Sequence, residues 1–353
     1  MRSILFSSIT TGFASWSNDL VLTDLDDLLN DVNSESFGAV DLSQLPLVDR
    51  IYPANVILET QIDHWGFHCL SGYVESIGPR RLFVIEIDSN DVLLSTSYSR
   101  YLNDILLEQT NGTEPLRIGR SGGYIPQNWR QYHDHLGIGY RSDFARSVGT
   151  VMIVPTEPGV FGSTLKFIIG PTEPQSFCFD NSLITIPIYL NHSNLFRIPI
   201  AVSLVDTRSN SPVFVVLQER FEAVHDDFAL QTSHKTTILP YMVRSALREI
   251  IADRFGPVDD EINGEYFVAS NCQRMIAELP SISFTIHDSI RPVYQVIMIP
   301  EDYVSSDEGR CRIHVSLDSN TPTLAPVLGQ QFFERVGVLL DYHNSQIGFC
   351  DPL

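Results

Sequence analysis

Two short stretches of the sequence combine polar side chains with the pattern of a tight turn after a strand. Their residues are Asp88, Ser89 and Asn90 in the first turn and Gln231, Thr232 and Ser233 in the second. A carboxylate such as that of Asp88 transfers protons when its surroundings tune its pKa. An amide such as that of Gln231 donates and accepts hydrogen bonds but cannot act as a general base. The first turn therefore offers acid–base chemistry, and the second offers hydrogen bonding alone.

The elements that position these turns are mostly strands. After residue 50, short β-branched and aromatic runs alternate with Pro, Gly, Asn or Asp, which is typical of an all-β protein. The runs lie at 82–88, 150–155, 163–170, 182–190, 196–206, 212–218, 281–286, 293–300, 311–317 and 336–342. Helical periodicity is clear at 240–255 and 329–336. Residues 230–240 predict a buried strand, a tight turn, a second short strand and the start of a helix.

Residues 1–50 differ from the rest and are predicted to form an acidic N-terminal extension. The apolar residues of TDLDDLLNDV (23–32) recur at i, i+3, i+4 and i+7, and Thr23 suits the N-cap position. We expect a short amphipathic helix here, which packs on the main body or on a partner.

The charge of the chain restricts the classes of partner that it is expected to bind. The net charge is −20 and the pI is about 4.7, which argues against nucleic acid and anionic membranes. No apolar run reaches the ~18 residues that a membrane span needs. The N-terminal MRSILFSSITTGFASW reads equally as a poor signal peptide or as an ordinary apolar segment. Sequons at Asn111 and Asn191 are compatible with a secretory, vacuolar or extracellular location, which stays open.

Several segments, taken in order, resemble the pepsin-type aspartic proteases. The quoted segments are VLGQQFFERVGVLLDYHNSQIGF (327–349), ELPSISFTI (278–286), IPEDYV (299–304), FRIPIAVSLVD (196–206), GSTLKFIIG (162–170) and HLGIGY (135–140). GYVESIGPRRLFVIEIDSNDVLL (72–94) resembles the family's opening strand and first active turn. The resemblance runs from residue 70 to residue 353 and rests on the order and spacing of the segments.

The resemblance implies two turns, each written Asp-Thr/Ser-Gly, whose carboxylates share one proton and one lytic water. It places the first Asp at Asp88, with Ser89 as the bracing hydroxyl. Asn90 replaces Gly, and Asn tolerates left-handed backbone conformations. A rival placement at ITTGFASW (9–16) has Thr10 where the Asp is needed and lacks the preceding strand.

The second turn departs further from the family pattern. In that pattern the Pro comes nine positions after the second Asp, and Pro240 likewise comes nine positions after Gln231. Gln231 therefore stands in the second Asp position. Ser233 replaces Gly, while His234 and Lys235 replace small residues of the cleft wall, and Lys235 adds bulk and positive charge.

The hairpin that covers substrate in this family, the flap, is also altered. Asp88 and Leu136 are 48 residues apart, which is about half the separation that the resemblance implies. The flap is therefore expected to be shortened, missing or rebuilt from SGGYIPQNW (121–129), with Tyr124 as the candidate flap tyrosine.

The resemblance also implies an architecture: a mainly β, bilobal pepsin-like acid protease fold with an interlobe sheet and a few short helices. We assign residues 51–180 to the N-terminal lobe and 181–353 to the C-terminal lobe. Val338, Leu340 and Ile347 are expected in the shared sheet. Cys272 and Cys311 lie where the family has a disulfide. The sequence contains no CxxC pair, so a zinc site or a thioredoxin-type redox site is not expected.

Three other stretches that contain histidine are weaker candidates for a site. His64 and His68 have the HxxxH spacing of a helical metal site, but the surrounding residues predict no helix. Residues 132–135 and 225–227 are expected to be loops. IGRSGG (118–123) lacks the Lys of a phosphate-binding loop. We expect no metal and no cofactor.

The preferred hypothesis is a catalytically inactive aspartic-protease homologue that acts as a structural module or binds an extended peptide or protein partner. The alternative is an active endopeptidase in which Asp88 acts with Asp227 or with a second copy of the chain. A third possibility is an assembly component that docks through residues 1–50. The sequence leaves the oligomeric state open.

Overall fold

The structure is a computed structural model, and it describes most of the chain after residue 55. The described residues are 56–64, 66–74, 80–87, 89, 92–94, 104–110, 115–120, 123–124, 134–160, 162–170, 176–179, 182–190, 196–206, 224–260, 266–288, 291–307, 309–318 and 325–353. The predicted extension at 1–50 lies outside them, as do Asp88 and Asn90. The division into lobes at residue 180 stays a prediction.

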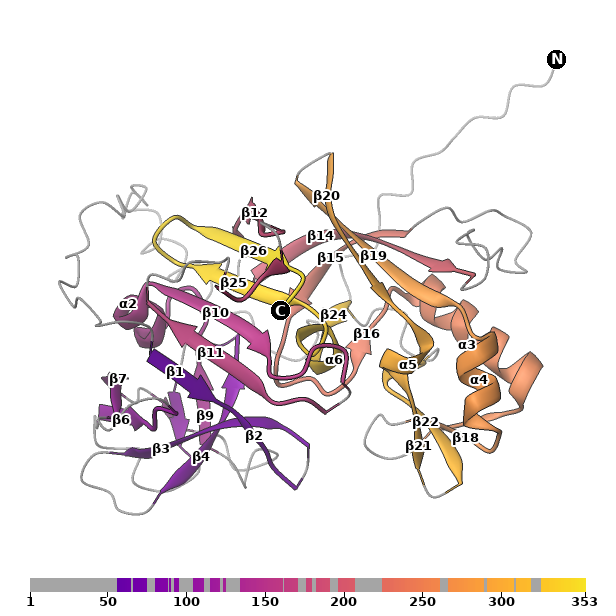
Figure 1. The fold of residues 1–353 in the computed structure, drawn as a ribbon, viewed down its shortest axis with the longest axis horizontal. Helices are drawn as coiled ribbons and strands as arrows, with labels where there is room; N and C mark the ends of the chain where they lie inside the picture. The colour runs from indigo at the N-terminus through magenta and orange to yellow at the C-terminus, as the bar shows by residue number, and fades with distance from the viewer. Residues whose placement is uncertain are drawn as a thin grey trace, which may run out of the picture. The chain divides into compact units, whose positions relative to one another are not determined.

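One sheet joins strands from both halves of the chain (Figure 1). In spatial order its strands are β1 (Val56–Glu59), β11 (Leu165–Ile169), β10 (Thr150–Pro155), β25 (Gly337–Asp341), β26 (Gln346–Cys350) and β12 (Ile184–Pro187). β10 pairs antiparallel with β25, with Ile153 opposite Val338. Val338, Leu340 and Ile347 are all buried in this sheet. The predicted interlobe sheet is therefore confirmed.

A second sheet is built from residues 61–137 and positions the first turn. Its order is β7 (Leu116–Arg120), β6 (Asp104–Leu107), β3 (His68–Val74), β4 (Arg81–Glu86), β9 (Asp134–Gly137), β5 (Val92–Leu94) and β8 (Gly123–Tyr124), with β2 (Gln61–Ile62) beside β3. β9 runs parallel to β4 on one side and antiparallel to β5 on the other. The end of β4 therefore lies in the middle of this sheet.

A third sheet positions the second turn. Its order is β20 (Arg291–Met298), β19 (Ser281–Asp288), β14 (Phe196–Val205), β15 (Val224–Leu230), β24 (Val327–Leu328), β16 (Thr237–Ile238) and β23 (Val315–Ser316), with β13 (Tyr189–Leu190) beside β14. β24 runs parallel to β15 and antiparallel to β16. β24 therefore holds the same position between β15 and β16 that β9 holds between β4 and β5.

A smaller sheet and five helices complete the described part of the chain. The sheet order is β17 (Val258–Asp260), β18 (Tyr266–Val268), β22 (Arg310–Ile313) and β21 (Val304–Asp307), and the helices are α2 (Asp143–Val148), α3 (Tyr241–Phe255), α4 (Cys272–Glu278), α5 (Pro300–Tyr303) and α6 (Gln330–Phe333). Of these, α3 and α6 lie in the two segments where the sequence shows helical periodicity, and the other three were not predicted. In the described residues, no helix has the length and apolarity that crossing a bilayer requires.

Helix α3 follows the second turn and anchors it. Val243, Ala246, Leu247 and Ile251 are buried, and their spacing places them on one helical face. The helix starts after Pro240, which has a favourable φ of −53°, and ends at Gly256, whose φ of 109° suits glycine. Burial of this face fixes the direction in which the chain leaves the turn.

All five cysteines lie in the described residues, and four of them form disulfides. Cys272 and Cys311 are joined, as the resemblance implied, with Cα atoms 5.3 Å apart. Cys178 and Cys350 form a second disulfide that the sequence analysis did not predict. Cys69 is buried and has a free thiol.

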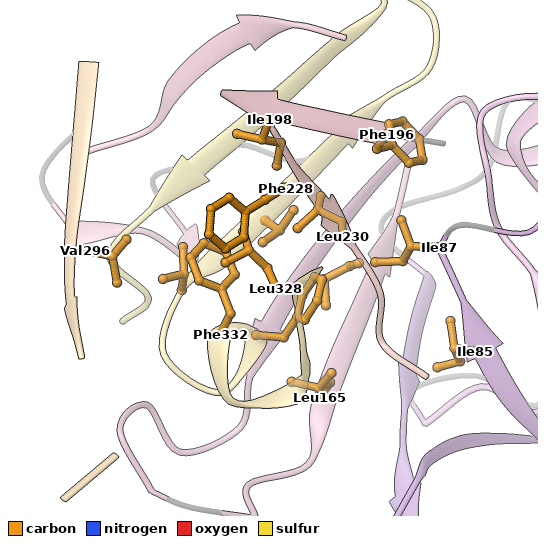
Figure 2. Close-up of a cluster of buried hydrophobic side chains, with 14 of the residues drawn as sticks. Ile85, Ile87, Leu165, Phe196, Ile198, Phe228, Leu230, Val296, Leu328 and Phe332 are labelled. Atoms are coloured by element: carbon orange, nitrogen blue, oxygen red, sulfur yellow. The ribbon is translucent and has the colours of Figure 1, made fainter. Parts of the chain in front are cut away.

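The two turns are backed by one hydrophobic core. Figure 2 shows that Ile85 and Ile87, near the first turn, share a cluster with Leu230 and Leu328, near the second. Phe332 of α6 lies in the same cluster, with ring contacts to neighbouring phenylalanines at centroid distances of 6.1–6.4 Å. The turns are therefore positioned by a common set of buried side chains.

Candidate functional site

The second turn, residues 231–236, connects β15 to β16. Gln231 follows β15 directly, and its backbone N–H donates to the carbonyl of Leu328 over 3.1 Å. The N–H of His234 donates to the carbonyl of Gln231 over 3.3 Å and closes the turn. The predicted order of strand, turn, short strand and helix is confirmed by β15, β16 and α3.

Gly329 supports this turn because the two backbones approach closely. A Cβ atom at Gly329 would lie 2.6 Å from the carbonyl oxygen of Thr236 and 2.8 Å from that of His234. Any larger residue would push the turn away. The next residue, Gln330, donates its N–H to the His234 carbonyl over 2.8 Å. This contact explains why glycine follows β24.

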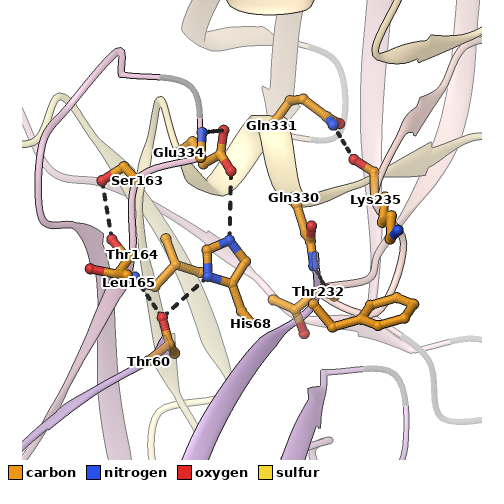
Figure 3. A network of polar contacts seen from close by, with 12 residues as sticks. Thr60, His68, Ser163, Thr164, Leu165, Thr232, Lys235, Gln330, Gln331 and Glu334 are labelled. Carbon is orange, nitrogen blue, oxygen red and sulfur yellow. Dashed lines mark hydrogen bonds and ion pairs between the residues drawn. The ribbon is translucent and has the colours of Figure 1, made fainter. Parts of the chain in front are cut away.

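Two buried glutamines at the start of α6 hold the turn in place (Figure 3). Gln330 donates from Nε2 to the Thr232 carbonyl over 3.1 Å. Gln331 accepts from the Thr237 N–H over 3.0 Å and donates to the Lys235 carbonyl. The backbone of the turn is thus satisfied by side chains of one rigid element, which preorganises it.

Thr232 links the second turn to the end of β4. Its hydroxyl donates to the carbonyl of Ile85 over 2.6 Å, and the side chain is 1% exposed. The two residues are far apart in sequence: Ile85 lies in β4 of the second sheet, and Thr232 lies in the turn that follows β15 of the third sheet. A short buried hydrogen bond between them holds the ends of β4 and β15 side by side.

The last residue of β4, Glu86, has a buried carboxylate. It is 3% exposed, and His135 Nδ1 of β9 lies 2.8 Å from its Oε1. Next to this pair, Arg81 forms an ion pair with Asp134 at 2.8 Å. The expectation that 132–135 form a loop is wrong for Asp134 and His135, which lie in β9. The signal in the sequence was a glutamate at the end of the apolar run 82–85 and a histidine next to Leu136.

His234 and Lys235 lie half-buried on the second turn. Burial lowers the pKa of the His234 imidazole, and the Glu86 carboxylate acts in the opposite direction. Glu86 is therefore close enough to the second turn to act on it electrostatically. The ammonium of Lys235 lies 5.2 Å from the ring centroid of Phe67, in a cation–π contact with the segment between β2 and β3.

The second turn and its sheet lie in a segment that matches a known family. A family model described as eukaryotic aspartyl protease matches residues 179–351. The chain is a homologue of the pepsin-type aspartic proteases. Its fold is mainly β, bilobal and pepsin-like, with an interlobe sheet and short helices, as predicted.

Two solved structures share the fold of this pepsin homologue. Basic 7S globulin from soybean is 14% identical, with a TM-score of 0.59 over 84% of this chain and 96% of that one. Conglutin gamma, a basic 7S globulin from lupine seeds, is 11% identical, with a TM-score of 0.57 over 85% of this chain and 95% of that one. No curated protein sequence matches the pepsin homologue.

The first turn of the pepsin homologue is described only in part. Asp88 and Asn90 lie outside the described residues, so the predicted role of Asp88 stays a prediction. The Ser89 N–H donates to the Glu86 carbonyl over 3.4 Å, and the Ser89 carbonyl accepts from Gly139 N–H over 2.8 Å. Tyr124 lies in β8, paired in parallel with Leu94, and its role as flap tyrosine also stays a prediction.

Asp227, the alternative partner for Asp88, lies away from the apex of the second turn. It is exposed on β15 opposite Pro199, four residues before Gln231. Four residues of strand span about 13 Å. The expectation of a loop at 225–227 is wrong, because these residues continue β15. Nothing in this arrangement brings Asp227 to the turn.

The remaining histidine candidate belongs to a structural network. His68 begins β3, and its ring lies 3.2 Å from Thr60 Oγ1 and 3.6 Å from Glu334 Oε1 (Figure 3). Thr60 also accepts from the Leu165 N–H over 2.8 Å. All three side chains are buried, so we assign them to the link between β3 and the end of α6. In the described residues, no group of three His, Cys, Asp or Glu side chains is placed to hold a metal.

Proposed function

We propose that this pepsin homologue is catalytically inactive and binds an extended peptide or protein segment. The single observation that carries the proposal is Gln231 at the head of the second turn, where the family pattern has an Asp. Pepsin-type chemistry needs two carboxylates that share a proton around one water. An amide holds no negative charge and takes no proton from water, so a turn headed by Gln231 supplies neither role.

The support around Gln231 argues for a retained binding role. Its turn keeps the backbone bonds to Leu328, the close approach of Gly329, and the side-chain contacts from Gln330. These contacts hold the turn in one conformation, so a peptide that binds there would not have to order it. Extended peptides bind chiefly through main-chain hydrogen bonds, which do not depend on a pair of carboxylates.

The proteolysis experiment tests the inactive half of the proposal. The purified full chain is incubated with unfolded casein at pH 3–5, with and without pepstatin, and fragments are counted by mass spectrometry. We expect no cleavage above that of a heat-denatured sample, and Gln231→Asn should change nothing. Pepstatin-sensitive cleavage that Asp88→Asn abolishes would overturn the proposal and favour the active endopeptidase.

The binding experiment tests the other half. A display library of extended peptides is selected against the full chain, and the affinity of the best peptide is measured by calorimetry. We expect Lys235→Ala, which alters a half-buried side chain on the turn, to weaken binding. The matched control is Lys166→Ala on β11, in the interlobe sheet, which should leave the affinity unchanged. Failure to select any peptide, or equal effects of the two variants, would contradict a ligand at the turn.

A further inference from the structure

We infer that Glu86, held by His135, occupies the position in the first turn that Gln231 occupies in the second. This inference deepens the proposed function and rests on it for the identity of the site. It replaces Asp88 as the first-lobe counterpart. The first turn would then begin with a carboxylate that is paired with His135, and the second turn would begin with a neutral amide. The pairing with His135 is a second departure, besides Gln231, from two carboxylates that share a proton.

The parallel strand pairs supply the first argument. In the second turn, Leu230 is paired with Leu328, a glycine follows Leu328, and Gln231 follows Leu230. In the first, Ile85 is paired with Leu136, a glycine follows Leu136, and Glu86 follows Ile85. Matching the two Leu-Gly pairs therefore matches Glu86 with Gln231.

The antiparallel pairs supply a second and independent argument. Ile238 of β16 is paired with Val327, the residue before Leu328. Leu93 of β5 is paired with His135, the residue before Leu136. Counting back seven residues from Ile238 gives Gln231, and counting back seven from Leu93 gives Glu86. The strand that leaves each turn therefore gives the same match as the strand that enters it.

The hydrogen bonds inside the turns agree with this register. His234 donates to the carbonyl of Gln231, three residues back, and Ser89 donates to the carbonyl of Glu86, also three residues back. The bond from Thr232 to Ile85 brings the two turn heads together, because each of these residues is next to one of them. Asp88 would correspond to Ser233, two residues beyond the head of the turn.

The surroundings of Glu86 explain what the pair with His135 does. Glu86 is buried, with His135 Nδ1 at 2.8 Å from Oε1, and its charge raises the pKa of His234 on the second turn against the effect of burial. This contact engages one oxygen of the Glu86 carboxylate, Oε1, and fixes the orientation of the group. The other oxygen, Oε2, takes no part in the contact, so the pair with His135 restrains how the carboxylate faces the opposite turn.

The experiment places a second carboxyl at the other turn head and measures which residue it senses. The side-chain carboxyl at position 231 of Gln231→Asp is titrated by carbon NMR in the full chain. The titration is repeated with Glu86→Gln added, and with Asp88→Asn added as the matched control. Adjacent carboxylates titrate in coupled steps, each raising the other's pKa. We expect Glu86→Gln to lower the pKa at position 231 by about one unit or more and Asp88→Asn to leave it unchanged.

A larger effect of Asp88→Asn than of Glu86→Gln, or no effect of either, would overturn the inference. A second measurement needs no change at position 231. The pKa of His234 is followed by NMR in the wild-type background, where Glu86→Gln should lower it and Asp88→Asn should not. If Glu86→Gln does not fold, Asp88→Asn alone decides the question. A change in the pKa of the carboxyl at position 231 or of His234 refutes the inference, and unchanged pKa values at both support it. The proteolysis result is independent, so an active enzyme with Glu86 at this position would refute only the proposed function.

Discussion

The hydrogen bond from Thr232 to Ile85 yields a quantitative prediction, because it is buried and joins the two turns. Thr232→Val removes the hydroxyl and keeps nearly the same shape. The side chain is 1% exposed and the bond is 2.6 Å long, so neither water nor a shifted side chain replaces the donor. Removing one partner of such a bond costs about 1–3 kcal/mol. We expect Thr232→Val to destabilise the chain by that amount.

Urea unfolding at pH 7, followed by circular dichroism, measures the change. The matched control is Thr232→Ser, which keeps the donor and loses one buried methyl group, a loss of about 0.8 kcal/mol. Binding of the selected peptide should weaken in Thr232→Val and not in Thr232→Ser, because only the former frees the two turns from each other. If Thr232→Val is no less stable than Thr232→Ser, the bond does not hold the turns together and the reasoning fails.

Three further predictions concern groups outside the turns. Burial lowers the pKa of His314 from 6.5 to about 3, so the unfolded chain takes up a proton before the folded chain does as the pH falls. The free energy of unfolding should therefore drop by up to about 5 kcal/mol between pH 6.5 and pH 3. In His314→Gln, the urea midpoint should depend less on pH over that range. Burial raises the pKa of the Cys69 thiol to about 12, so iodoacetamide at pH 8 should label it only in denaturant; rapid labelling of the folded chain would contradict this. Tyr303 is fully buried and donates to a carbonyl over 2.5 Å, so Tyr303→Phe should cost about 1–3 kcal/mol. The same change at the partly exposed Tyr294 should cost less, and equal costs would refute the assignment.

Much of the C-terminal half was predictable because its signals are local. The turn at 231–236, α3 and α6 each show a pattern within about 15 residues, and these elements lie where the sequence places them. The disulfide between Cys272 and Cys311 required the resemblance. The one between Cys178 and Cys350 joins residues 172 apart and left no local pattern.

The residue that begins the first turn could not be predicted from local sequence. In the strand that the sequence predicts at 82–88, residues 86 and 88 would share one face, because side chains alternate with a period of two. A slip of two residues therefore keeps every apolar residue on its side and leaves no trace in the sequence. The inference that Glu86 heads the first turn rests instead on the pairing of Ile85 with Leu136, which lies far along the chain.

By itself, the sequence determined the fold class, the family resemblance and an amide at position 231, since each depends on residue types in fixed local order. Only the tertiary structure decided which residues meet: Thr232 with Ile85, and Glu86 with His135. The physical reason is that these contacts cross between strands whose relative register is set by packing and backbone hydrogen bonds over the whole sheet. No short segment contains that information.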